Sequence, residues 1–308
     1  MQWKNRVARR IKLRELQMLQ AVAQTGSMMK AAASLAVSQS AISKSIAEME
    51  HTLGMPLFDR TARGVVPTPC ARVLLKRGAA IFDELRQGIE EIEFLADPTA
   101  GELRIGTTEP MAAILSAAIE RLSRRYPLMV FHVTVGDTGI LLRDLRDRNL
   151  DLAITRMVAT DAESDIEVET LFHDRLAVIA GQTNPLTTRR KLTLHELINE
   201  PWTLPPPDNF LSRFIAESFL VRGLELPRAT VITPSIHMRN SLLAAGRFIT
   251  MLPNAVLRFP GYRGFLKGLP VQLKETTRPI GLIRLKKREL GPAADLFLQA
   301  VRLTASTR

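Results

Sequence analysis

The chain has 308 residues, of which 46% are apolar and 5% aromatic, so it can build two or three globular domains and is not a wholly disordered protein. Its net charge of +11 is concentrated at one end: residues 1–80 contain 13 Lys and Arg against 4 Asp and Glu, whereas the remainder contains 29 against 27. There is no run of eighteen apolar residues and no secretory signal pattern, so the sequence predicts neither a membrane span nor export. With Cys70 as its only cysteine, the chain cannot form an intrachain disulfide, and we expect a cytoplasmic protein.

The basic N-terminal quarter predicts a surface that faces a polyanion. Clustered cations gain free energy by releasing the counterions condensed on phosphates, so nucleic acid or an anionic membrane surface is the expected partner. A basic tail that serves only solubility is the alternative on composition alone.

Three short helices are predicted within this quarter. The first covers residues 12–24 and stops before Gly26, and the second covers residues 28–35 after a cap at Ser27. Ser38 caps the third helix, which ends at Gly54. Two short helices joined by a tight turn, with a buried stripe on the second, indicate a helix-turn-helix.

The third helix leaves an unusual polar face exposed. The amide of Gln39 can form two hydrogen bonds with adenine, Lys44 can bind guanine or phosphate, and short side chains let a helix sit deep in the major groove. After this helix, residues 56–68 read as a hairpin with Arg60 and Arg63 near its tip, which could press against the minor groove. A solvated, serine-rich face on an ordinary three-helix domain is the alternative.

At this point residues 16–75 resemble the N-terminal domain of LysR-type transcriptional regulators. The resemblance rests on the run GSMMKAAASLAVSQSAISKSIAEMEHTLGMPLFDRTARGVVPT. It implies a DNA-binding set on the recognition helix and the wing, namely Ser38, Gln39, Ser40, Ser43, Lys44, Arg60, Arg63 and Thr68. The sequence Thr-Pro-Cys-Ala at 68–71 departs from the Thr-Glu-Ala-Gly common in the family, and we expect Cys70 to be a small packing residue rather than a redox sensor.

Residues 71–96 predict a long helix with a dimerisation stripe. Its apolar and glycine positions alternate in steps of four and three: Leu74, Gly78, Ile81, Leu85, Gly88, Ile92 and Leu95. Packing of this stripe on the helix's own C-terminal domain is the alternative. The family resemblance favours a homodimer, and family members are usually homotetramers. A two-fold dimer would read an inverted repeat in double-stranded DNA.

The remainder of the chain predicts a two-lobed α/β domain. Strands at residues 103–107, 130–135 and 152–155 alternate with helices at 111–126 and 140–148, which favours a mostly parallel sheet. A second group has strands at 176–180, 202–204, 229–233 and 248–252 with helices at 210–222 and 237–245, and a strand and a helix follow at 279–285 and 293–303. This part resembles the family's effector domain, shaped like a periplasmic binding protein. We therefore expect an α/β fold class with an all-α winged helix-turn-helix at residues 1–70, a linker helix and hinge at 71–100, and an effector-binding domain at 101–308. Its lobe I would cover about 101–170 and 276–308, and lobe II about 171–275.

A small-molecule effector is expected between the lobes, because ligands of open α/β sheets bind beyond the carboxyl ends of strands and near helix N-termini. The candidate contacts are Thr107, Thr108, Asp137, Thr138, Arg156, Asn209 and Phe210. Each could instead be a cap or turn residue. Glu109 and Asp137 would repel a carboxylate unless Arg156 compensates, so hydroxyl-rich ligands such as sugars stand beside the aromatic and organic acids common in this family.

No enzyme is predicted. Five scattered histidines lack metal spacing, and the chain has no phosphate loop and no Gly-x-Ser-x-Gly. Carboxylates at Asp144, Asp147 and Asp151 interleave with arginines, which is typical of a solvated helix face. No cofactor, metal or membrane partner is expected.

A solute-binding protein of a transporter and a non-specific structural DNA binder are alternatives, but each leaves part of the chain unused. A ligand-responsive regulator uses every segment: the effector would shift lobe closure, and with it DNA bending and access of RNA polymerase. The effector, the operator and the sign of regulation stay open.

Overall fold

A computed structural model of the chain describes residues 11–61, 64–157, 165–258, 262 and 264–306. The chain divides into two compact units, Met1–Ile89 and Glu90–Arg308. Among the described residues, no helix combines the length and apolarity that crossing a bilayer requires.

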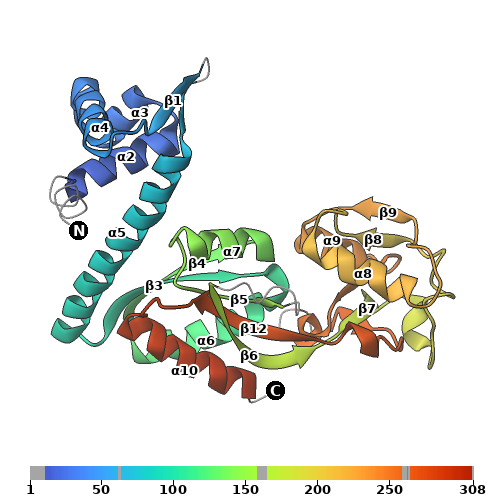
Figure 1. The fold of residues 1–308 in the computed structure, drawn as a ribbon. Coiled ribbons are helices and arrows are strands. Elements are labelled where there is room, and N and C mark those ends of the chain that lie inside the picture. The colour runs from blue at the N-terminus through green and yellow to red at the C-terminus, as the bar shows by residue number, and fades with distance from the viewer. Residues whose placement is uncertain (1–10, 62–63, 158–164, 259–261, 263, 307–308) are drawn as a thin grey trace. The chain divides into compact units, whose positions relative to one another are not determined.

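The first unit is a winged helix-turn-helix (Figure 1). Its helices are α2 (Leu13–Thr25), α3 (Met28–Ser34) and α4 (Gln39–Leu53), and its wing consists of the antiparallel strands β1 (Phe58–Thr61) and β2 (Gly64–Pro67). The predicted caps hold: Gly26 and Gly54 end α2 and α4 in the left-handed conformation, and the Ser27 and Ser38 hydroxyls accept backbone N–H groups of the helices they begin. The three predicted helices are therefore confirmed within one residue at each end.

Two contacts fix the wing to the helices. The Glu50 carboxylate at the end of α4 accepts hydrogen bonds from the N–H groups of Leu57 (2.6 Å) and Phe58 (3.3 Å). On the other strand, the Val65 N–H donates to the Gly26 carbonyl at 3.0 Å. Gly64 has φ +125°, and a Cβ there would overlap that same carbonyl oxygen, so only glycine fits this close approach.

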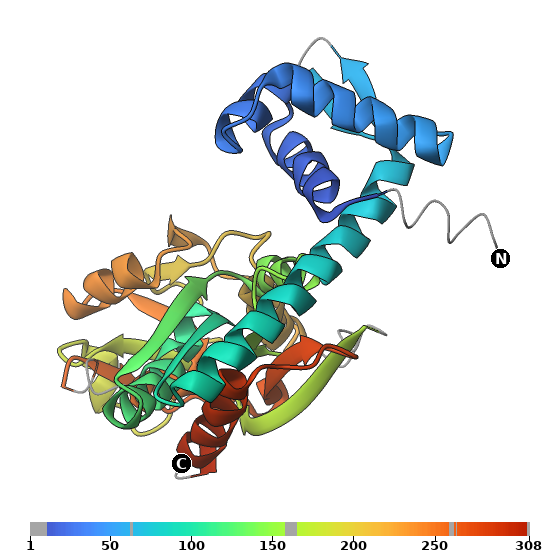
Figure 2. The same ribbon diagram turned by 90° about the vertical axis from the view of Figure 1, so that its left-hand side faces the viewer.

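The long helix is α5 (Pro69–Ala96), a single unbroken helix (Figure 2). Its predicted stripe divides in two. Leu74 packs against the core of the first unit and Gly78 is buried beside Leu16, whereas Ile92 and Leu95 further along are 69% and 82% exposed. The exposed part continues the apolar pattern with no cover among the described residues of this chain.

The first sheet of the second unit has the strand order β4-β3-β5-β12-β6. Its strands are β3 (Ala100–Thr107), β4 (Leu128–Val135), β5 (Leu152–Arg156), β6 (Ile166–Asp174) and β12 (Arg278–Leu285). The pairs β3–β4 and β3–β5 are parallel as predicted, but β12 is antiparallel to both of its neighbours. The expectation of parallel strands is thus confirmed for β3, β4 and β5, and the returning strand β12 is the exception because it runs in the opposite direction.

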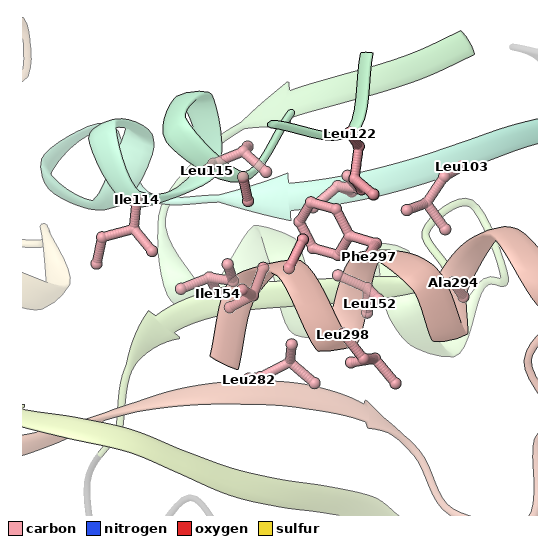
Figure 3. Packing of buried hydrophobic residues seen from close by; sticks show 14 of the residues in the cluster. Leu103, Ile114, Leu115, Leu122, Leu152, Ile154, Leu282, Ala294, Phe297 and Leu298 are labelled. Atoms are coloured by element: carbon pink, nitrogen blue, oxygen red, sulfur yellow. The ribbon is translucent and has the colours of Figure 1, made fainter. Parts of the chain in front are cut away.

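Helices cover both faces of this sheet (Figure 1). A short 3-10 turn (Glu109–Met111) leads into α6 (Ala112–Arg125), which lies with α10 (Pro292–Ser306) on one face, and α7 (Thr138–Arg146) lies on the other. Phe297 of α10 is fully buried among leucines and isoleucines of α6 and the strands (Figure 3). This close packing makes the sheet a rigid support for the loops at its strand ends.

A buried ion cluster ties the start of this lobe to its end. The Asp151 carboxylate accepts hydrogen bonds from the Arg104 N–H (2.8 Å), the Arg104 guanidinium (3.1 Å) and the Arg288 guanidinium (2.6 Å). Burial opposes ionisation of Asp151, but the bonds and charges of the two arginines outweigh it and hold the pKa of this carboxyl below its usual value. The expectation of a solvated face is therefore wrong for Asp151.

The second sheet has the order β11-β7-β10-β8-β9. Its strands are β7 (Leu176–Gly181), β8 (Trp202–Leu204), β9 (Ala229–Ile232), β10 (Ile249–Pro253) and β11 (Leu266–Gly268), with helices α8 (Phe210–Leu220) and α9 (Ile236–Ala244) and 3-10 turns Pro185–Thr188, Asn254–Arg258 and Lys274–Thr276. Alternate residues of β7 pack against α8 and α9, which therefore cover opposite faces. The chain passes between the sheets twice, after Asp174 and before Arg278. Strand β6 of the first sheet therefore ends four residues beyond 170, where the sequence predicted the first part of lobe I to end.

Candidate functional site

The recognition helix α4 presents the predicted polar face to solvent. Gln39, Ser40, Ser43 and Lys44 are all exposed, whereas Ile42 and Ile46 of the same helix are buried. The Ser38 hydroxyl accepts a hydrogen bond from the N–H of Ala41 (3.1 Å) and is paired with the Ser40 hydroxyl (2.9 Å). Its main contact is therefore the cap of α4. The Lys44 ammonium lies 3.9 Å from Glu48 with both side chains largely exposed, a weak pair that a phosphate can replace.

The wing and α4 border a groove of about 430 Å³ that is lined in part by Gln39, Ser43 and Arg60. Arg60 is exposed on β1, and Arg63 lies outside the described residues. Thr68 corrects the prediction of a DNA contact: it is buried, its hydroxyl donates to the Pro56 carbonyl (2.9 Å) and accepts from the Ala71 N–H (3.2 Å). It therefore joins the wing to α5 from inside.

Cys70 also differs from expectation. It is exposed at the beginning of α5, with its Sγ 3.4 Å from the Met55 sulfur, rather than packed in a core. Among the described residues, no group of three or more His, Cys, Asp or Glu side chains could hold a metal ion.

A cavity of about 310 Å³ lies between the two sheets of the second unit. Its wall comes from the carboxyl ends of β4 and β5, the 3-10 turn after β3, and the beginnings of α7, α8 and α9. Met111, Val135, Phe210, Leu211 and Ile236 give it an apolar lining. A cavity of this size and lining fits the body of a small organic molecule.

Six of the seven predicted effector contacts line this cavity: Thr108, Asp137, Thr138, Arg156, Asn209 and Phe210. Thr107 does not, because its side chain is fully buried and its hydroxyl lies within hydrogen-bonding distance of the Thr108 and Ile154 carbonyls. The prediction is wrong at this position since the last residue of the strand points into the sheet's packing.

Several of the six have their polar atoms engaged in local structure. The Asp137 and Asn209 side chains cap α7 and α8 by accepting the N–H groups of Ile140 (3.0 Å) and Leu211 (2.9 Å). The Thr138 hydroxyl is paired with that of Thr155 at 2.7 Å. These residues shape the cavity wall, and their hydrogen-bonding groups are already partly or wholly used.

Arg156 is also engaged. Its guanidinium donates to the Asp174 carbonyl (3.1 Å), the Asp174 carboxylate (3.3 Å) and the Thr276 carbonyl (3.2 Å). Burial lowers the pKa of Arg156 to about 10 even though the Asp174 charge opposes that shift. Because Asp174 and Thr276 lie where the chain passes between the two sheets, Arg156 joins these two passages and is not a free counter-charge for a ligand.

The sequence reasoning missed Arg239, on the first turn of α9. This residue lines the cavity and is 2% exposed, and in the described part of the chain its Nε and Nη1 have no hydrogen-bond partner. Burial lowers its pKa to about 10, and the negative charge of Glu109 opposes that shift. A cation near a helix N-terminus is unfavourable for the helix dipole, and this position was the one signal in the sequence that could have singled it out.

The chain matches known proteins over both units. Residues 13–72 match the family described as bacterial regulatory helix-turn-helix protein, lysR family, and residues 96–305 match the LysR substrate binding domain. The regulator GbpR of Azospirillum brasilense is 28% identical over 301 residues, 97% of this chain and 88% of that protein. The dual regulator GltC of Bacillus subtilis is 28% identical over 263 residues, 85% of this chain and 87% of that protein.

Solved structures show the same fold. Full-length CbnR, a LysR family regulator, in complex with its target DNA aligns with a TM-score of 0.66 at 20% identity, over 96% of this chain and 100% of that one. Full-length OxyR of Pseudomonas aeruginosa aligns with a TM-score of 0.69 at 20% identity, over 95% and 98%. The family matches cover a helix-turn-helix region and a substrate-binding domain, and the relatives are regulators rather than enzymes. The chain therefore belongs to the LysR family of bacterial transcriptional regulators.

Proposed function

We propose that this regulator reads its operator with the exposed face of α4 and positions itself with the wing. Gln39 is the base-reading residue, because its exposed amide can pair with an adenine edge, while Lys44 and Arg60 bind phosphates. Ser40 and Ser43 are short enough to let the helix approach the groove floor. The observation that carries this proposal is the division of α4 into an exposed polar face and a fully packed apolar one.

Fluorescence anisotropy tests this assignment with a duplex from upstream of the protein's own gene and a scrambled duplex, across salt concentrations. Gln39→Ala should lose about 1–3 kcal/mol of binding to the native duplex and almost none to the scrambled one. Gln17→Ala is the matched control, since Gln17 is exposed on α2. Equal loss on both duplexes would show that Gln39 positions the helix and does not read bases.

We further propose that residues 1–70 are the DNA-binding domain, 71–100 the dimerisation helix and hinge, and 101–308 the effector domain, and that the protein works in the cytoplasm on operator DNA. The exposed apolar positions Ile81, Leu85, Ile92 and Leu95 support a homodimer through α5. A homotetramer and contact with RNA polymerase extend this proposal by family likeness. Sedimentation of the full chain tests the assembly, with Leu95→Glu expected to weaken self-association.

The cavity between the two sheets is proposed to bind the effector. It is supported by the apolar lining and by convergence of strand ends and helix starts from both lobes. A ligand there would favour one relative position of the lobes over another, and so alter DNA binding or activation.

A pair of variants on strand β4 tests the cavity. Val135 lines it, and Val133, two residues earlier on the same strand, is similarly exposed but does not. In a thermal-shift screen of organic acids and sugars, a compound that stabilises the wild type should fail with Val135→Trp and still act on Val133→Trp. A compound that stabilises both variants equally binds elsewhere and would contradict the assignment.

A further inference from the structure

The beginning of α9 is an anion-binding arrangement that already holds a carboxylate from the other lobe. The Ile236 N–H, at the first residue of α9, donates to the Glu109 carboxylate at 3.3 Å, a contact between residues 127 apart in the chain. At the same helix end the Met238 N–H donates to the capping hydroxyl of Ser235 (3.1 Å). The helix end therefore offers the Ile236 N–H and the positive end of its dipole toward the cavity.

Arg239 adds a second and independent anion-binding feature one turn further along the same helix. It is buried on the cavity wall, and its Nε and Nη1 have no hydrogen-bond partner among the described residues. Buried guanidinium donors without an acceptor are costly, and the cost is recovered when a carboxylate accepts two of them at once. The arrangement is thus incomplete without an anion.

Glu109 meets this need only in part. Its charge acts on Arg239, yet no ion pair within 4.0 Å joins the two in the described part of the chain, and its one hydrogen bond to α9 is long. A ligand carboxylate free to enter the cavity could reach both the guanidinium and the helix end. It could not do so while Glu109 stays in place, because two carboxylates at one helix end repel each other.

We propose that Arg239 and the N-terminus of α9 form a carboxylate-binding subsite, and that Glu109 is its built-in occupant, displaced when a small organic acid binds. The proposal rests on the effector role of the cavity and names the ligand class: a carboxylate with an apolar body. It also gives the ligand a route to regulation. Glu109 belongs to the first lobe and α9 to the second, so displacement removes a hydrogen bond that links the lobes.

The decisive comparison is between Glu109→Gln and a matched control. Glu196→Gln makes the same change at a carboxylate that also accepts a backbone N–H, from Thr193 at 2.8 Å, but lies outside the cavity. Calorimetry on the full-length protein would use hexanoate and benzoate, each beside its neutral amide. Glu109→Gln should bind a carboxylate about tenfold more tightly than the wild type, or ~1.4 kcal/mol. Glu196→Gln should stay within about twofold, and the amides should show no gain with either variant.

Arg239→Gln should abolish carboxylate binding while keeping the fold, because it removes a buried charge whose Nε and Nη1 have no hydrogen-bond partner among the described residues. A spectroscopic readout checks displacement itself: with the protein labelled on isoleucine nitrogen, the Ile236 amide signal should move in Glu109→Gln and, in the wild type, on carboxylate binding. If Arg239→Gln does not fold, the comparison of Glu109→Gln with Glu196→Gln still decides.

Two results would overturn the proposal. Carboxylate binding that depends on Arg239 but is unchanged or weakened in Glu109→Gln would mean that Glu109 does not occupy the subsite, and the effector role of the cavity would stand. Binding of neither acid by any variant would remove the carboxylate subsite. The Val135→Trp screen, which includes sugars, would then decide separately whether the cavity binds effectors at all.

Discussion

Asp151→Asn should destabilise the effector domain strongly, although the two side chains have nearly the same size and shape. The carboxylate holds Arg104 and Arg288, and the Arg288 side chain is fully buried. In the variant the neutral amide no longer supplies the negative charge that Asp151 gives to Arg288, whereas the bond of Arg288 to the Leu150 carbonyl (2.6 Å) is kept. Removing one partner of a buried ion pair costs about 3–5 kcal/mol, and we expect about 3 here because that bond survives.

The contribution of Asp151 to the free energy of unfolding should also depend on pH. The pKa of Asp151 is lower in the folded protein than its ordinary value of 3.8, so the stabilisation is fully present above that value and is lost as the pH falls through the folded pKa. Urea unfolding followed by circular dichroism at pH 7 and at about pH 2.5, below the ordinary pKa, would measure both effects. The wild type should lose stability on acidification, and Asp151→Asn should lose less.

Asp165→Asn is the control for that measurement. Asp165 also binds an arginine, Arg146 at 3.1 Å, but both side chains are partly exposed, so the change should cost less than about 1 kcal/mol. Equal losses in Asp151→Asn and Asp165→Asn would refute the reasoning, because burial would then make no difference to the value of the pair.

Three further substitutions have defined outcomes. Gly64→Ala should destabilise the winged unit by about 1–3 kcal/mol in thermal unfolding, because φ +125° is strained for alanine and the new Cβ would strike the Gly26 carbonyl; an unchanged melting temperature would contradict this. Arg156→Met should lower the stability of the effector domain by about 3 kcal/mol, since it removes the Arg156 cation from the buried Asp174 carboxylate, and a loss below about 1 kcal/mol would speak against that role. Ser38→Ala should cost about 1 kcal/mol of unfolding free energy through the lost cap of α4, whereas Ser38→Asp should largely restore it.

The elements best predicted from sequence are those whose limits depend on neighbouring residues. Helices α3 and α4 begin at Ser27 and Ser38 and α4 ends at Gly54, and these signals act within a single turn. Strand β6 was missed for the opposite reason. Its sequence IEVETLFHD places polar residues among apolar ones at the edge of a sheet, whereas a buried parallel strand reads as a nearly continuous apolar run.

The residues that line the cavity could largely be predicted from the sequence, but the contacts of its charged side chains could not. Strand ends and helix starts, read from the sequence, put Thr108, Asp137 and Phe210 on its wall. The state of each charge depends on contacts across the fold: Arg156 is engaged by Asp174 and Thr276, which lie 18 and 120 residues away. The place of Arg239 in the first turn of a helix is a local signal, but no local pattern reveals that its Nε and Nη1 have no hydrogen-bond partner among the described residues.

The hydrogen bond between the Val65 N–H and the Gly26 carbonyl, together with the Glu50 contacts to Leu57 and Phe58, makes the recognition helix and the wing one stiff reading head. These bonds hold β2 against the helices, so we expect the wing to stay in contact with a half-site as long as α4 stays in the major groove. Two copies of such a head can alter the length of DNA between their contacts only by moving as whole bodies. Weakening the bond between Val65 and Gly26, for example by lengthening the turn at Gly26, should therefore change the affinity for a single half-site without changing the preferred spacing between two half-sites.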